Sequence, residues 1–131
     1  MKKASGRVAF TGLLAALALS FSFLEGLIPP IPVLPPGAKL GLSNIVVLYA
    51  AGSLGLPAAL FLACLKGGFA LLTRGVTAGL LSISGGVLSA LVMWLLLQKT
   101  RASLSLVGVC GALSHNAAQL CAAWLLTSAA V

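Results

Sequence analysis

The chain has 131 residues, a length that allows one domain. Apolar residues make up 60% of it and charged residues only 7%, against about a quarter in soluble domains, so the composition excludes a soluble fold and predicts an integral membrane protein. Eight Lys and Arg residues stand against one acid, Glu25, for a net charge of +7, and the lack of any Asp excludes a carboxylate pair for acid–base catalysis or a carboxylate set for Mg²⁺.

The first apolar run, residues 8–28, is long enough for a membrane-spanning helix and carries Glu25 near its far end. A secretory signal peptide is the competing interpretation, because basic residues precede the run. The run is longer than the apolar core of such a peptide, and no small-residue cleavage site comes before Pro29, so we favour a retained helix.

Five prolines then fall between residues 29 and 36, a density that no helix interior tolerates. We expect residues 29–41 to form a proline-rich extracytoplasmic loop. Four more apolar segments follow, and the first of them is short for a full span. They cover residues 42–52, 57–73, 76–98 and 104–128. The sequence therefore predicts an all-α, polytopic membrane helix bundle of about five transmembrane helices that forms one transmembrane domain over residues 1–131.

Short loops rich in Lys and Arg mark the cytoplasmic side of a membrane protein. With the N-terminus inside, the cytoplasmic basic residues are Lys2, Lys3, Arg7, Lys99 and Arg101, and only Lys39 and Arg74 lie outside. We therefore expect a multi-pass protein of the bacterial inner membrane with a cytoplasmic N-terminus. The basic balance reports this orientation, and since no motif of an RNA or DNA reader is present we expect no nucleic acid partner. The three cysteines lie in apolar runs without metal-ligand spacing, and we expect neither a metal nor a cofactor.

Ionisable residues at membrane depth are costly and call for an explanation. Glu25 has two: an ion pair with Lys39 or Arg74 that holds the loop down, or a substrate or proton contact at the outer mouth. Lys66 lies near the middle of its segment, where snorkelling to the surface is a long reach, so we favour an interior cation that meets an anionic or carbonyl group of a ligand. Arg74, eight residues further on, is expected to extend Lys66 into a cationic stripe facing the bundle interior.

The last segment carries the most polar patch, Ser114-His115-Asn116-Ala117-Ala118-Gln119. His115 and Gln119 are four residues apart and share one helix face, which Asn116 flanks. Hydrogen bonding between helices is the structural alternative. The clustering of three strongly hydrogen-bonding side chains favours a binding site.

Small residues recur every four positions along the first segment, at Gly12, Ala16 and Ser20. Such stripes let two membrane helices approach closely. We interpret this one as a surface for docking a partner helix.

Several separated motifs resemble the bacterial Gx transporter family, also labelled heptaprenyl diphosphate synthase component I. They are Leu24-Glu25-Gly-Leu-Ile-Pro-Pro, Pro36-Gly-Ala-Lys-Leu-Gly-Leu-Ser-Asn-Ile-Val47, the basic residue Lys66, the stretch from Ser82 to Gly86, and His115-Asn116-x-x-Gln119. The second motif adds Asn44 to the candidate substrate-binding residues. That family is similar to the substrate-binding S components of energy-coupling-factor vitamin transporters, in which a small-residue motif on the first helix docks on the coupling subunit.

The resemblance implies six helices, one more than predicted here, so that a pocket wall would be missing or borrowed from another chain. It also implies an arginine where Lys66 stands. Our leading interpretation is a substrate-binding and transport subunit for a small molecule, with ATPase and coupling subunits as partners because the chain has no phosphate-binding loop. The alternative is a non-catalytic component I of heptaprenyl diphosphate synthase with a soluble prenyl synthase subunit as partner, since a chain without Asp cannot hold Mg²⁺ on a diphosphate. An inactive remnant is the third interpretation.

Overall fold

The computed structural model describes residues 2–29, 32 and 41–130, and this part of the chain is helical without any strand. The helices are α1 (Lys2–Leu27), α2 (Leu42–Ser53), α3 (Leu56–Arg74), α4 (Val76–Lys99) and α5 (Leu104–Ala129). The predicted all-α bundle is confirmed, and the predicted segments agree with the helices to within a few residues except at the N-terminus, where α1 begins six residues earlier. Most of the predicted loop 29–41, with Lys39, lies outside the described residues.

Glycine and a polar cap explain where the long helices break. Gly75 alone separates α3 from α4 and has φ 97°, a left-handed conformation that L side chains rarely adopt, so the chain reverses there within one residue. Before α5, the Ser103 side chain accepts a hydrogen bond of 3.3 Å from the backbone N–H of Leu106 and caps the helix. The polar and glycine residues between the apolar runs therefore act as turns and caps.

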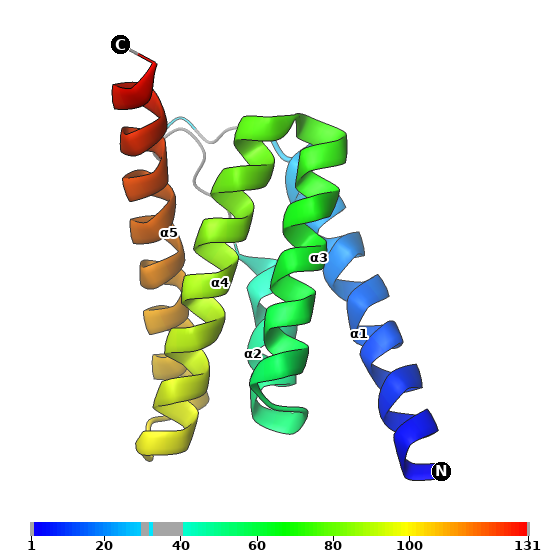
Figure 1. Ribbon diagram of the computed structural model, residues 1–131. Coiled ribbons are helices and arrows are strands. Elements are labelled where there is room, and N and C mark those ends of the chain that lie inside the picture. The colour runs from blue at the N-terminus through cyan, green and yellow to red at the C-terminus, as the bar shows by residue number, and fades with distance from the viewer. Residues whose placement is uncertain (1, 30–31, 33–40, 131) are drawn as a thin grey trace.

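Helices α5, α4, α3 and α1 stand side by side in that order, and α2 packs against all four of them (Figure 1). α1, α3 and α5 run in one direction and α4 in the other, so the two ends of the chain lie at opposite ends of the bundle. α2 begins about halfway along the bundle and fills only the half nearer the N-terminus. A polar cavity, described below, lies at the level where α2 begins.

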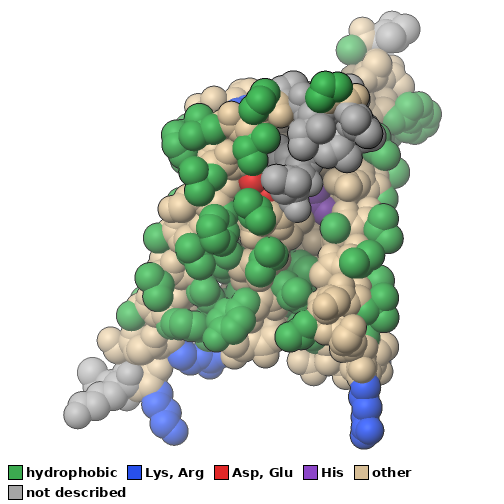
Figure 2. Space-filling view, turned by 180° about the vertical axis from the view of Figure 1, so that it is seen from behind, with side chains coloured by type: hydrophobic (Ala, Val, Ile, Leu, Met, Phe, Trp, Pro, Cys, Tyr) green, Lys and Arg blue, Asp and Glu red, His purple; other side chains and the backbone are tan. Residues whose placement is uncertain are grey.

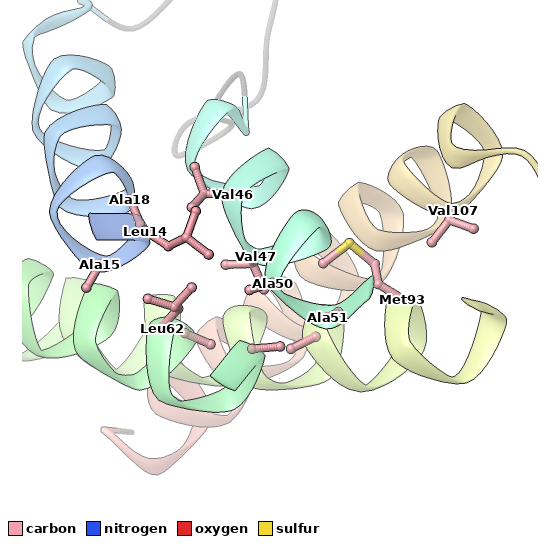
Figure 3. Packing of buried hydrophobic residues seen from close by; sticks show 13 residues of the cluster. Leu14, Ala15, Ala18, Val46, Val47, Ala50, Ala51, Leu62, Met93 and Val107 are labelled. Atoms are coloured by element: carbon pink, nitrogen blue, oxygen red, sulfur yellow. The ribbon is translucent and has the colours of Figure 1, made fainter. Parts of the chain in front are cut away.

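The apolar core forms around α2, where its small side chains bring neighbouring helices close (Figure 3). Val47, Ala50 and Ala51 of α2 lie among Leu14 of α1, Leu62 of α3 and Met93 of α4. Large apolar side chains also cover the outside, including Leu72 and Trp124, which are 83% and 69% exposed. An apolar exterior over a core of small residues is typical of a bundle surrounded by lipid.

In the described part of the chain, four helices are long and apolar enough to cross a membrane: α1, α3, α4 and α5. α2, with 12 residues, rises about 18 Å, whereas the hydrocarbon core of a bilayer is about 30 Å thick. The protein is thus a polytopic bundle of five helices, of which four are candidate membrane spans and α2 is a short apolar helix, and the predicted polytopic bundle is confirmed.

Basic side chains gather at the end of the bundle where the N-terminus and the α4–α5 connection lie (Figure 2). Arg7 donates a hydrogen bond of 3.3 Å to the carbonyl oxygen of Leu54 and thereby ties α1 to the α2–α3 turn at this end. Lys99 ends α4 and Arg101 follows in the connection to α5. Arg74 lies at the opposite end, at the turn between α3 and α4.

Candidate functional site

A polar cavity lies at the level where α2 begins, and all five helices contribute to its wall. It has a volume of about 30 Å³, enough for about two water molecules. The lining residues are Ser22 and Glu25 of α1, Gly41, Ser43 and Asn44 at the start of α2, Lys66 of α3, Ser82 of α4, and Ala112, His115, Asn116 and Gln119 of α5. In an otherwise apolar bundle, this is a concentration of polar groups that the core does not need for packing.

The start of α2 is built by a glycine and by the only acid of the chain. Gly41 has φ 77°, and its carbonyl oxygen accepts a hydrogen bond of 2.9 Å from the backbone N–H of Asn44. The carboxylate of Glu25 accepts a hydrogen bond from the backbone N–H of Leu42. A carboxylate is favoured there because the N-terminus of a helix carries a partial positive charge and free N–H groups. Glu25 therefore fixes the point inside the bundle at which α2 begins.

Ser43 connects the negative and positive charges of the site. Its hydroxyl donates to Oε2 of Glu25 over 3.1 Å and accepts from Nζ of Lys66 over 3.0 Å. Nζ of Lys66 also donates to Oδ1 of Asn44 over 2.7 Å. Lys66 and Glu25 are 4% and 8% exposed, so each charge is compensated inside the protein. These contacts exclude the snorkelling alternative for Lys66.

His115 faces the cavity from α5 and is 8% exposed. Its Nδ1 atom is buried and has no hydrogen-bond partner among the described residues. Buried polar atoms are usually paired, so an unpaired one in a cavity wall is a notable exception. Asn116 is exposed and Gln119 is half-buried, and both line the same cavity. The polar patch of α5 therefore supplies hydrogen-bonding groups opposite the Glu25–Ser43–Lys66 chain.

Six of the eight candidate substrate-binding residues thus surround one cavity: Glu25, Asn44, Lys66, His115, Asn116 and Gln119. Their role as ligand contacts stays a prediction. Lys39 lies outside the described residues.

The expected cationic stripe of Lys66 and Arg74 is wrong. Arg74 is exposed at the end of α3 and does not line the cavity. Eight residues of an α-helix turn through two full turns and about 80° more, so the two side chains project from different faces. The alternative in which Glu25 pairs with Arg74 is not observed, because the carboxylate of Glu25 accepts hydrogen bonds at the start of α2 instead.

Sequence reasoning missed three serines of the cavity wall: Ser22, Ser43 and Ser82 are all buried. Ser22 precedes Glu25 by three residues and so shares its helix face, a signal that could have identified it. Ser43 and Ser82 stand in stretches quoted for the resemblance, but serine is common in membrane helices and gives no specific signal.

The small-residue stripe of α1, Gly12, Ala16 and Ser20, is exposed along its whole length. The buried face of α1 carries Leu14, Ala15 and Ala18 instead. A Cβ added at Gly12 would meet no atom within 4 Å. Within the described chain the stripe is therefore open to a partner, and its role in docking stays a prediction.

The fold and the site together define a polytopic helical membrane protein with a charge-paired polar cavity inside the bundle. A comparison with protein families finds a match to heptaprenyl diphosphate synthase component I over residues 14–131. The chain belongs to this family. No curated protein and no solved structure matches it.

Proposed function

We propose that the chain is a membrane-embedded subunit that binds a small polar molecule for transport, in the manner of an energy-coupling-factor S component. The observation that carries this proposal is the cavity between the Glu25–Ser43–Lys66 chain and His115. Polar groups are expensive inside a membrane bundle and mark substrate pathways when they are present. Nδ1 of His115 has no hydrogen-bond partner among the described residues and is therefore a group that a ligand could engage.

The arrangement offers defined contacts to a ligand. The ammonium of Lys66 has three N–H donors, and among the described residues two of them are used, by Ser43 and Asn44, so that one is available to an acceptor such as a carbonyl oxygen. Nδ1 of His115 and the amides of Asn116 and Gln119 supply further hydrogen bonds that fix the orientation of the molecule. A cavity of about 30 Å³ holds only water, so binding requires the start of α2 and the facing part of α5 to move apart.

The charge distribution supports an orientation for this subunit. Short basic connections mark the cytoplasmic side, and the end of the bundle with Arg7, Lys99 and Arg101 matches that description. We place this end in the cytoplasm of a bacterium, and the ligand then enters from the outer side, between the proline-rich loop and the outer ends of α1, α3 and α5.

The partners follow from what the sequence lacks. It has no phosphate-binding loop, so an ATPase would supply the energy through a coupling subunit. The exposed stripe of Gly12, Ala16 and Ser20 is the surface on which we place that coupling subunit.

Native mass spectrometry of the protein purified from its own membranes in mild detergent tests the proposal. The wild type is expected to retain a small molecule, and Lys66→Met is expected to lose it. Lys99→Met is the matched control, because it removes the same charge at the exposed end of α4 and leaves the cavity unchanged. A wild type that carries no small molecule, or a Lys66→Met variant that keeps it, would overturn the proposal.

A second candidate function is favoured by the family itself: a membrane component that assists a heptaprenyl diphosphate synthase. The chain contributes no Asp for Mg²⁺, so catalysis would belong to a soluble partner subunit. Recovery of such a subunit together with bound prenyl diphosphate in the same experiment would favour this function.

A further inference from the structure

Among the described residues that line the cavity, one side chain is negative and one is positive, and the hydroxyl of Ser43 joins them. Ser43 donates to Glu25 and accepts from Lys66, so a change at either charge is transmitted to the other. No other Lys, Arg, Asp or Glu among the described residues lines the cavity. The partial positive charge at the N-terminus of α2 is likewise met by Glu25, through the N–H of Leu42.

A ligand that brings a net negative charge into this site would face the carboxylate of Glu25. It would compete with Glu25 for Lys66 and for the N–H groups of α2, and one of the two anions would remain uncompensated in a medium of low dielectric constant. A ligand without net negative charge leaves the existing pairing intact and needs only the free donor of Lys66 and the polar groups of α5. The charge balance thus discriminates between these two ligand classes.

We propose that Glu25 is a specificity-determining residue that restricts the cavity to polar molecules without net negative charge and excludes phosphates and diphosphates. This inference rests on the proposed function, since it names the class of ligand for the same site. It separates the two candidate functions as well, because a prenyl diphosphate belongs to the excluded class.

The test uses inorganic pyrophosphate as the probe, titrated into the purified protein in an uncharged detergent at low ionic strength, with thermal unfolding and calorimetry as readouts. The wild type is expected to show no binding. Glu25→Gln keeps an oxygen that can accept from Leu42 but leaves the charge of Lys66 uncompensated, so it is expected to bind pyrophosphate, with an affinity at least about tenfold above the weakest that the calorimetry detects, and to rise in Tm with it. Ser82→Ala, which removes a buried neutral hydroxyl of the same cavity, is the control and should gain nothing.

A second variant covers the case in which Glu25→Gln fails to fold. Asn116→Lys adds a cation to the cavity wall at an exposed position and keeps Glu25, and it is also expected to gain pyrophosphate binding, whereas Asn116→Gln is not. Pyrophosphate binding by the wild type that Lys66→Met removes would overturn the inference, and so would the absence of any gain in both charge variants. The titration needs no natural ligand, so its failure leaves the proposed function standing, and the mass spectrometric test of that function is decided separately.

Discussion

The imidazole of His115 on α5 lies directly against the backbone of Gly85 on α4. A Cβ atom added at Gly85 would lie 2.9 Å from Cε1 of His115, closer than real Cβ contacts allow, and 3.0 Å from its Nδ1, which is tighter than most of them. The absence of a side chain at position 85 therefore creates the space in which His115 turns toward the cavity.

We predict that Gly85→Ala displaces His115 and weakens ligand retention in native mass spectrometry. The added methyl group overpacks the α4–α5 contact, at a cost of about 1–3 kcal/mol in stability. Gly68→Ala is the matched control, because a Cβ there meets no atom within 4 Å, and it should leave both ligand retention and Tm unchanged or slightly raised. Equal behaviour of the two variants would contradict the placement of His115.

A double-mutant cycle tests the bridge between Glu25 and Lys66. Glu25→Gln and Lys66→Met each leave one buried charge without its compensating partner, and each is expected to lower the free energy of unfolding by about 3 kcal/mol. The double variant removes both charges, so its loss should be clearly smaller than the sum of the two. Thermal and denaturant unfolding in detergent measure the coupling, and additive losses would show that the two charges do not interact.

Close contacts between α3 and α4 and between α4 and α5 allow two glycines to be compared, Gly79 of α4 and Gly111 of α5. A Cβ at Gly79 would lie 2.5 Å from Cβ and 2.8 Å from Cα of Leu71, and neither atom can move without the backbone. A Cβ at Gly111 would lie 2.5 Å from Sδ of Met93, on a flexible side chain that can rotate away. We predict that Gly79→Ala lowers the Tm considerably more than Gly111→Ala does, and the reverse order would show that α3 and α4 adjust more freely than their packing indicates.

Site-directed labelling tests the proposed orientation with two matched positions at opposite ends of the bundle. Thr73 and Thr100 are both exposed, and both hydroxyls bond to a carbonyl of their own helix. In a background without Cys64, Cys110 and Cys121, a membrane-impermeant maleimide should label Thr73→Cys in intact cells. It should label Thr100→Cys only after permeabilisation, and the opposite pattern would reverse the orientation.

The exposed stripe of α1 provides a prediction about partners. Ala16→Leu adds bulk to a face that is exposed in the described chain, so the free energy of unfolding should change by less than about 0.5 kcal/mol. The same change should reduce recovery of co-purifying membrane subunits, because close helix packing needs small residues. Ala117→Leu, on an exposed face of α5, is the control. Equal recovery of partners with both variants would remove the stripe as a docking surface.

The helices were predictable because the apolar runs are separated by clear breaks. Gly75 and the polar stretch before α5 mark turns that the structure uses, and an ionisable or strongly polar residue in such a run has to face the interior. This rule identified Glu25, Lys66 and His115 as candidate site residues without any knowledge of the fold, and the structure brings them to one cavity.

The sequence did not reveal which faces of the helices meet one another in the folded bundle. Spacing within α3 was expected to bring Arg74 beside Lys66, but a difference of about 80° between helix faces is enough to separate them. The bridging role of Ser43 depends on α2 starting inside the bundle, which is a property of the packing of α2 against four other helices. Serine gives no periodic signal that would have revealed it.

The parallel course of α1 and α3 has a consequence for how the protein is made (Figure 1). Four long helices inserted one after another alternate in direction, so α1 and α3 can be parallel only if the chain recrosses the bilayer between Leu27 and Leu56. The helix described in that interval is α2, whose length is too short for it to be recognised as a span by itself. Because α3, α4 and α5 are synthesised after α2 and all contribute to the cavity wall, the polar cavity can be completed only after α5 has been made.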